Sequence, residues 1–141
     1  MLGVKAPAAA VTIALVAAVG CGQSTLDSKA VRSEAESVHS MAVEGGILAD
    51  QLRRDRIKES YAQVDAADLA DLAAKSQQKL EPSVATPKLK STVEQLQTIA
   101  EDVSIELRGI ETDPRETSVL RSASRQLDRL ASKADEIESR L

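Results

Sequence analysis

Three stretches of the chain repeat an apolar residue at alternating steps of four and three, and this spacing is the strongest constraint on the fold. Such a repeat puts the apolar side chains on one face of an α-helix and is typical of helices that pack with a left-handed twist. The first stretch contains Val31, Ala35, Val38, Ala42, Gly45, Ala49 and Leu52. The other two contain Leu89, Val93, Leu96, Ala100, Val103, Leu107 and Ile110, and then Leu120, Ala123, Leu127, Leu130, Ala134, Ile137 and Leu141.

Residues 57–80 show a weaker helical pattern, which we interpret as a further helix. Its predicted buried face consists of Ile57, Tyr61, Val64, Leu69, Leu72 and Leu80. The run 53–56 before it contains neither Gly nor Pro, so one continuous helix is an alternative. We favour a break because the apolar stripe changes phase between Leu52 and Ile57.

Four helices are therefore expected, over residues 27–53, 57–80, 87–109 and 114–140. Short links between long helices favour antiparallel neighbours. The sequence predicts an all-α protein, an antiparallel up-down-up-down four-helix bundle with coiled-coil-like heptads. The apolar faces formed by the heptads could pack against helices of the same chain or against helices of another chain.

Proline and glycine mark the predicted helix boundaries. Pro82 ends the second helix, and Thr86-Pro87 is predicted to cap and open the third. Gly109 is expected as the C-terminal cap of the third helix. The segment 113–116 is interpreted as a capping box, with Asp113 as the N-cap of the fourth helix and Glu116 three residues later.

Residues 1–20 have the layout of a secretory signal. A short start with Lys5 as its one basic side chain precedes an apolar run from Ala8 to Val19. That run is in the length range of signal peptides and is shorter than the ~20 residues that span a bilayer. We therefore predict export and removal of this segment.

The apolar run ends in Ala18-Val19-Gly20-Cys21, which resembles the lipobox of bacterial lipoproteins; Ala18 replaces the more common Leu. The resemblance implies cleavage between Gly20 and Cys21 and a diacylglyceryl lipid on Cys21, with palmitate or a similar acyl chain on the new amino group. It also implies a cell-envelope location, lipid-anchored on the extracytoplasmic face of a bacterial membrane. Residues 21–26 would be the lipidated Cys and a short tether, and residues 27–141 the bundle domain. The alternatives are an ordinary signal peptide and a buried helix of a cytosolic protein.

Charge and composition restrict the binding partners. Without Lys5, 17 basic and 22 acidic residues give a net charge of −5. An acidic surface for which we expect no basic stripe argues against nucleic acid and against a polybasic lipid-binding patch. Tyr61 is the only Phe, Tyr or Trp residue, which leaves no aromatic platform for stacking bases or sugars.

His39 is the only histidine, and with Glu36 it forms an E-x-x-H motif on a predicted helix. A di-iron bundle needs two such motifs, so the sequence predicts no metal site, no cofactor and no enzyme activity. The function that we favour is a structural or protein-interaction role, with an envelope protein or a second copy as partner. The alternative is a small-ligand or metal-binding bundle that would use Glu36, His39, Glu44, and Asp65 or Asp68.

Small residues form one face of the first helix, with Gly45 and Gly46 at its centre. Two glycines inside a helix cost about 1–2 kcal/mol relative to alanine, so we expect a compensating close contact, within the bundle or with a partner helix. The segments 41–49 and 61–69 are loosely similar to an "AEG-x-L-L-A … H/D-A-x-x-L" pattern in small helical bacterial proteins. This similarity implies no activity.

Overall fold

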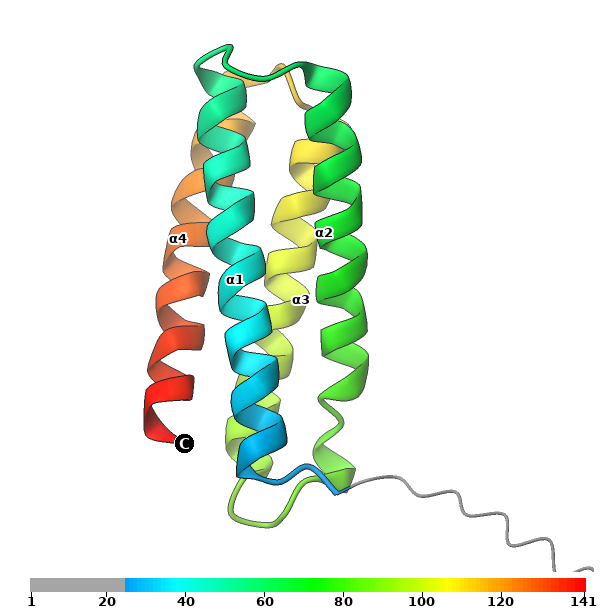
Figure 1. The fold of residues 1–141 in the computed structure, drawn as a ribbon, viewed down its shortest axis with the longest axis vertical. Coiled ribbons are helices and arrows are strands. Elements are labelled where there is room, and N and C mark those ends of the chain that lie inside the picture. Colours follow the sequence, from blue (N-terminus) through cyan, green and yellow to red (C-terminus); the bar gives the residue numbers. More distant parts are fainter. Residues whose placement is uncertain (1–24) are drawn as a thin grey trace, which may run out of the picture.

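The computed structural model describes residues 25–141. Its long helices are α1 (Ser28–Arg53), α2 (Glu59–Lys79), α3 (Lys90–Thr112) and α4 (Thr117–Arg140), and a short 3-10 helix, η1 (Pro82–Val84), lies between α2 and α3. Successive long helices run in opposite directions (Figure 1). The predicted all-α, antiparallel four-helix bundle is confirmed.

The four helices are not equally spaced. α1 packs mainly against α4, and α2 packs mainly against α3. α1 also contacts α3 across the centre, whereas α2 and α4 do not touch anywhere in the described chain. The cross-section is therefore a rhombus, and the outer sides of α2 and α4 face away from each other.

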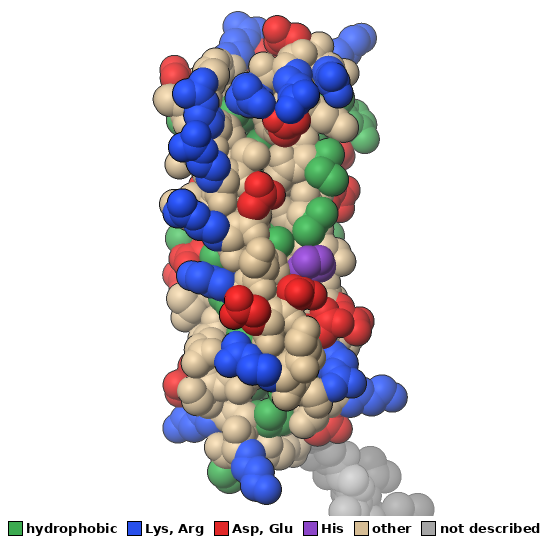
Figure 2. All heavy atoms as spheres, turned by 90° about the vertical axis from the view of Figure 1, so that its left-hand side faces the viewer, with side chains coloured by type: hydrophobic (Ala, Val, Ile, Leu, Met, Phe, Trp, Pro, Cys, Tyr) green, Lys and Arg blue, Asp and Glu red, His purple; other side chains and the backbone are tan. Residues whose placement is uncertain are grey.

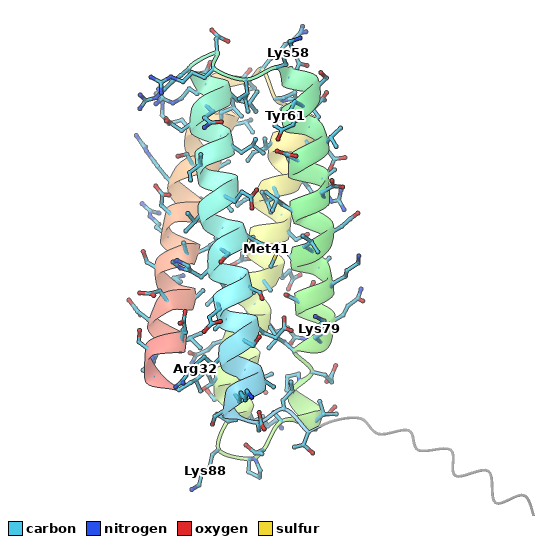
Figure 3. All side chains as sticks on the ribbon, viewed as in Figure 1. Arg32, Met41, Lys58, Tyr61, Lys79 and Lys88 are labelled. Atoms are coloured by element: carbon cyan, nitrogen blue, oxygen red, sulfur yellow. The ribbon has the colours of Figure 1, made fainter. Side chains whose placement is uncertain are left out.

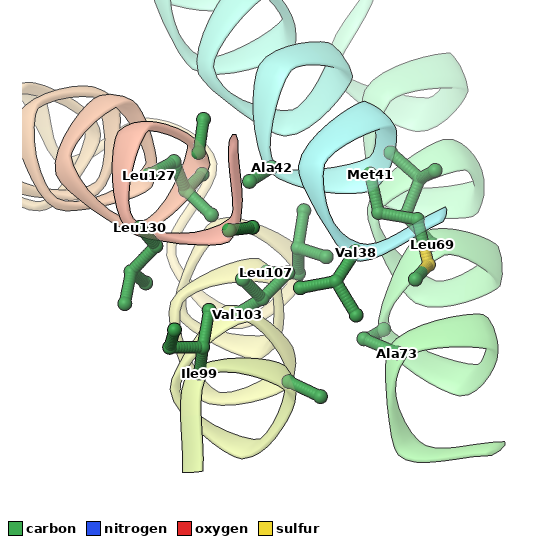
Figure 4. Close-up of a cluster of buried hydrophobic side chains, with 14 of the residues drawn as sticks. Val38, Met41, Ala42, Leu69, Ala73, Ile99, Val103, Leu107, Leu127 and Leu130 are labelled. Carbon is green, nitrogen blue, oxygen red and sulfur yellow. The ribbon is translucent and has the colours of Figure 1, made fainter. Parts of the chain in front are cut away.

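The three regular apolar stripes form the core. Every predicted heptad residue of α1 is buried, and so are those of α3 and α4 apart from the partly buried Leu89 and Leu141 at the ends. Val38, Val103, Leu107 and Leu127 meet near the middle of the bundle (Figure 4). Within residues 25–141 no buried side-chain nitrogen or oxygen lacks a hydrogen-bond partner, so burial leaves no polar side-chain atom unsatisfied.

The small face of α1 allows close contact inside the bundle. A Cβ atom on Gly45 would lie 2.5 Å from Leu107 Cδ2 and 3.1 Å from Leu127 Cδ1, which is closer than van der Waals packing permits. A Cβ on Gly46 would lie 3.1 Å from Asp128 Oδ1. The sequence left open whether the small face of α1 contacts a helix of the same bundle or a partner helix. In the structure it contacts α3 and α4 of the same bundle.

The predicted buried face of α2 is wrong in part. Leu69 and Leu80 are buried, but Tyr61, Val64 and Leu72 are 60%, 60% and 50% exposed. The face that packs against the other helices consists mainly of Ala62, Ala66, Leu69, Ala70, Ala73 and Ser76. Alanines let α2 approach α3 closely, and this close packing decides the orientation of α2 in place of the larger apolar residues.

The predicted break between the first two helices is confirmed, and it has the geometry of a Schellman motif. The Arg56 N–H donates to the Gln51 carbonyl over 2.9 Å, and the Asp55 N–H donates to the Leu52 carbonyl over 3.0 Å. Asp55 has φ 53°, in the left-handed region where glycine is usual. No glycine or proline marks this helix end in the sequence, because aspartate takes the position of glycine.

The predicted starts of α3 and α4 are each three residues too early. At Thr86-Pro87 the chain first makes a turn, in which the Leu89 N–H donates to the Thr86 carbonyl over 2.9 Å, and α3 then begins at Lys90. At Asp113-Pro114 the Glu116 N–H donates to the Asp113 carbonyl over 3.2 Å, and α4 begins at Thr117. Proline suits the second position of a β-turn as well as the first turn of a helix, so the sequence does not distinguish the two.

The cap residues between α3 and α4 therefore differ from the prediction. Gly109 is not a cap; α3 continues to Thr112, and Asp113 is its C-cap. The N-cap of α4 is Glu116, whose Oε1 accepts hydrogen bonds from the N–H and the hydroxyl of Ser118 at 3.4 and 2.8 Å. The predicted capping box is thus replaced by a turn that joins the two helices.

Candidate functional sites

The lipobox residues Gly20 and Cys21 lie outside the described residues, so the structure begins just after them. Leu26, the second described residue, is held against the loop between α2 and α3. Its N–H donates to the Val84 carbonyl over 2.9 Å, and its carbonyl accepts from the Thr86 N–H over 3.4 Å, which makes an isolated parallel bridge with Ala85. Only residues 22–25 separate Cys21 from this attachment point.

The first helix begins directly after Leu26. Asp27 is its N-cap, and Asp27 Oδ1 accepts a hydrogen bond from the Ala30 N–H over 2.8 Å. Leu26 itself is buried in the core. The ordered domain therefore includes Leu26, which the sequence assigns to the tether, and its first backbone contacts are with the loop 80–89.

His39 joins α1 to α4. Its Nδ1 lies 3.0 Å from the Ala131 carbonyl oxygen, and the ring is half-buried. Because a carbonyl only accepts hydrogen bonds, Nδ1 carries the proton in this contact. Glu36, the other member of the E-x-x-H motif, is exposed on the outside of α1.

The residues of the metal-binding alternative do not come together. His39 faces α4, whereas Asp65 and Asp68 lie on α2, which does not contact α4. From residue 25 to residue 141, no three His, Cys, Asp or Glu side chains are arranged to hold a metal ion. The histidine of the E-x-x-H motif instead makes a contact between packed helices, with the Ala131 carbonyl on α4.

Several large apolar side chains are exposed on α1 and α2, and we name this set the α1–α2 outer face: Ile47, Tyr61, Val64 and Leu72. Tyr61 lies in the first turns of α2, near the end of the bundle where α1 and α2 are joined (Figure 3). The negative charge of Asp65 raises the pKa of Tyr61, with a smaller contribution from Glu44. Acidic groups thus lie beside the exposed apolar side chains.

Ser76 is the buried polar residue of the described core, and it was not among the residues predicted to be buried. Its hydroxyl donates to Glu34 Oε2 over 2.8 Å, and Lys79 Nζ lies 3.3 Å from Glu34 Oε1. These contacts link α2 to α1. Ser76 follows Ala73 by three residues and lies in line with the alanine face of α2. This spacing could have identified Ser76 as buried.

Four basic residues lie at steps of four along α4 and are all exposed; we name Arg121, Arg125, Arg129 and Lys133 the α4 basic stripe. None of the four forms an ion pair with any residue between 25 and 141. Figure 2 shows a column of Lys and Arg side chains down one edge of the face on which α4 lies. The expectation of a surface without a basic stripe is therefore wrong, because the net charge averages over opposite sides of the molecule.

No known protein family, curated protein sequence or solved structure matches this chain. Within residues 25–141, no helix has the length and apolar character needed to cross a membrane.

Proposed function

We propose that the protein is a lipoprotein, anchored on the extracytoplasmic face of a bacterial membrane through Cys21, with a structural or protein-interaction role. The observation that carries the proposal is the sequence Val19-Gly20-Cys21 directly after the apolar run 8–19. In this reading the signal is cleaved after Gly20, and two or three acyl chains on Cys21 provide lasting attachment. One chain alone binds only marginally, because each buried CH₂ contributes about 0.8 kcal/mol.

The contacts of Leu26 support the proposed anchor. A segment tied by two backbone hydrogen bonds to the loop 80–89 starts the folded domain five residues after Cys21. Four extended residues reach about 14 Å, so a bundle anchored in this way stays next to the lipid headgroups. The proposal therefore includes a bundle held close to the membrane.

An interaction role is supported by the α1–α2 outer face. Tyr61, Val64 and Leu72 are half or more exposed although alanines fill the packed side of α2. Tyrosine is among the side chains that contribute most to protein–protein binding when a partner covers it. This face is accordingly our candidate for the surface that an envelope protein binds.

The anchor can be tested with Cys21→Ser in the native host. We expect the variant to lose labelling by a fatty-acid analogue and to leave the membrane fraction, since Cys21 is the only cysteine. A matched control, Cys21→Ser with Ser24→Cys, retains one thiol three residues beyond the lipobox and should also stay unlabelled. Unchanged membrane attachment of Cys21→Ser, or full labelling of the control, would refute the anchor.

The interaction role can be tested by cross-linking in intact cells and identifying the proteins that co-purify. We expect a defined partner with the native chain and its loss with Tyr61→Ser/Leu72→Ser. Glu36→Gln on the outside of α1 is the matched control and should retain the partner. Recovery of monomer alone, under conditions that capture other envelope complexes, would count against an interaction role.

A further inference from the structure

The four basic residues of the α4 basic stripe form no ion pair within residues 25–141. Like charges four residues apart on a helix repel one another and weaken it. Arg121, Arg125, Arg129 and Lys133 make three such neighbouring pairs, and none of them is relieved by an ion pair. An external anion would remove this repulsion.

The upper part of the stripe borders a surface hollow. Its lining residues are Ser118, Arg121, Ser122, Arg125, Gln126 and Arg129. Three arginines, two serines and a glutamine line the hollow, and the hydroxyl of one of the serines, Ser118, donates to the neighbouring Glu116 carboxylate. Guanidinium groups bind phosphate oxygens with charge-assisted hydrogen bonds, and hydroxyl and amide donors can add to them. The chemistry of the hollow therefore suits phosphate groups.

Acidic residues lie to the sides of the stripe. Asp128 is on the flank towards α1, and Asp102 and Glu106 share a second hollow with Arg129 and Lys133 on the flank towards α3. The acids of α2, the helix opposite α4, are about two helix diameters away, roughly 20 Å. That distance is more than twice the Debye length of about 8 Å at physiological ionic strength. The α2 acids consequently do little to oppose an anion on the outward side of α4, whereas Asp128, Asp102 and Glu106 border it.

We propose that the α4 basic stripe binds the phosphate headgroups of anionic lipids, so that the bundle lies on the membrane along α4. This inference rests on the proposed lipid anchor at Cys21, which makes headgroups the nearest anionic surface. The stripe follows the long axis of the bundle over about 18 Å, as twelve residues at 1.5 Å each. Steps of four turn by about 40° each on a helix of 3.6 residues per turn, so the four side chains fan over about 120° of the outer side of α4. A bundle that lies down brings Arg125 and Arg129, in the middle of this fan, to the membrane surface, with Arg121 and Lys133 on either side of them.

The expected affinity of the stripe for an anionic bilayer is enough to orient an anchored bundle but too weak to anchor the protein by itself. Each basic side chain near an anionic bilayer strengthens binding about fivefold, so four give a Kd of about 1 mM. Free protein would bind little at that affinity. A short tether provides an effective concentration in the mM range, at which about half of the anchored molecules lie down.

The orientation can be measured on the mature lipoprotein in vesicles of phosphatidylcholine, with or without phosphatidylglycerol. A reporter cysteine is introduced at Ser122 within the stripe or at Ser60 on α2, and both serines are exposed. Each lies about 28 Å along its helix from the tethered end, so an upright bundle exposes them equally. The readout is the rate of modification by a polyethylene glycol maleimide.

We expect Ser122→Cys to react about twofold more slowly with phosphatidylglycerol present, and Ser60→Cys to react at an unchanged rate. Arg125→Glu/Arg129→Glu, or 0.5 M salt, should abolish the difference. Equal rates at the two positions on anionic vesicles would overturn the proposal, as would protection that survives the charge reversal.

Other occupants of the stripe give different results, each of which overturns the lipid assignment. Protection on neutral vesicles by added poly-glutamate or single-stranded DNA, without an effect of phosphatidylglycerol, would assign the stripe to a soluble polyanion. Protection on neutral vesicles that grows with protein density would assign it to a second copy. Failure of the anchor is separate, since an unanchored protein would not co-sediment with neutral vesicles at all.

Discussion

At the scale of single residues, Gly45 and Gly46 are adjacent but differ in the space beside them. We expect Gly45→Ala to lower the free energy of unfolding by about 1–2 kcal/mol, because overpacking against the buried Leu107 and Leu127 exceeds the gain in helix propensity. Gly46→Ala should raise it by up to about 1 kcal/mol, because the exposed Asp128 carboxylate can turn away. Urea unfolding of both variants measures the difference, and equal effects would contradict the close contact at Gly45.

Asp55 is the other residue with a special backbone requirement. Its φ of 53° is unfavourable for residues with a Cβ, and short polar residues tolerate it best. We expect Asp55→Gly to be more stable than Asp55→Ala by about 1 kcal/mol, with Asp55→Asn between them as a control for the lost charge. Thermal melting of the three variants tests this order. An alanine variant as stable as the glycine variant would argue against the left-handed cap.

At the scale of elements, α2 is the helix whose orientation the sequence predicts least well. Leu69 and Leu72 are chemically identical residues one turn apart, and the first is buried while the second is half exposed. Leu69→Ala should lower the free energy of unfolding by about 2–4 kcal/mol, and Leu72→Ala by less than about 0.5 kcal/mol. Chemical denaturation provides the test, and a larger effect at Leu72 would restore the face that the apolar pattern favours.

The third helix carries a carboxylate in an unfavourable position. Burial raises the pKa of Glu106, and the neighbouring Asp102 charge adds to the rise. A raised pKa in the folded state means that stability is present at low pH and is lost as pH rises through that pKa. We expect Glu106→Gln to stabilise the fold at pH 7 by about 0.2–0.5 kcal/mol and to have no effect below pH 4. Denaturation at both pH values, with the exposed Glu101→Gln as control, measures this; a gain that persists in acid would exclude titration as its cause.

At the scale of the whole molecule, the apolar stripes of all four helices are covered by the same chain. The heptads of α1, α3 and α4 and the alanines of α2 all point into one core. We therefore expect the mature chain without its lipid to sediment as a monomer in analytical ultracentrifugation. A stable dimer that Leu72→Ser does not disrupt would mean that copies meet through another surface.

The features that the sequence predicts well depend on local periodicity. Alternating steps of four and three identify α1, α3 and α4 and nearly all of their buried residues, because an apolar side chain at a heptad position has one favourable environment. The phase change after Leu52 likewise locates the first break. The resemblance to a lipobox involves residues 18–21 and is a prediction of the sequence alone.

Other features depend on which helices become neighbours. The orientation of α2 follows from how closely alanines let it approach α3, and the direction of His39 follows from the position of Ala131 on α4. The α4 basic stripe is separated from the acids of α2 because α2 lies on the opposite side of the bundle. Sequence by itself determined how many helices form and which face of three of them is buried, since spacing along one helix sets both. Tertiary structure decided the packed face of α2 and the separation of charge, since both require distances between residues remote in the chain.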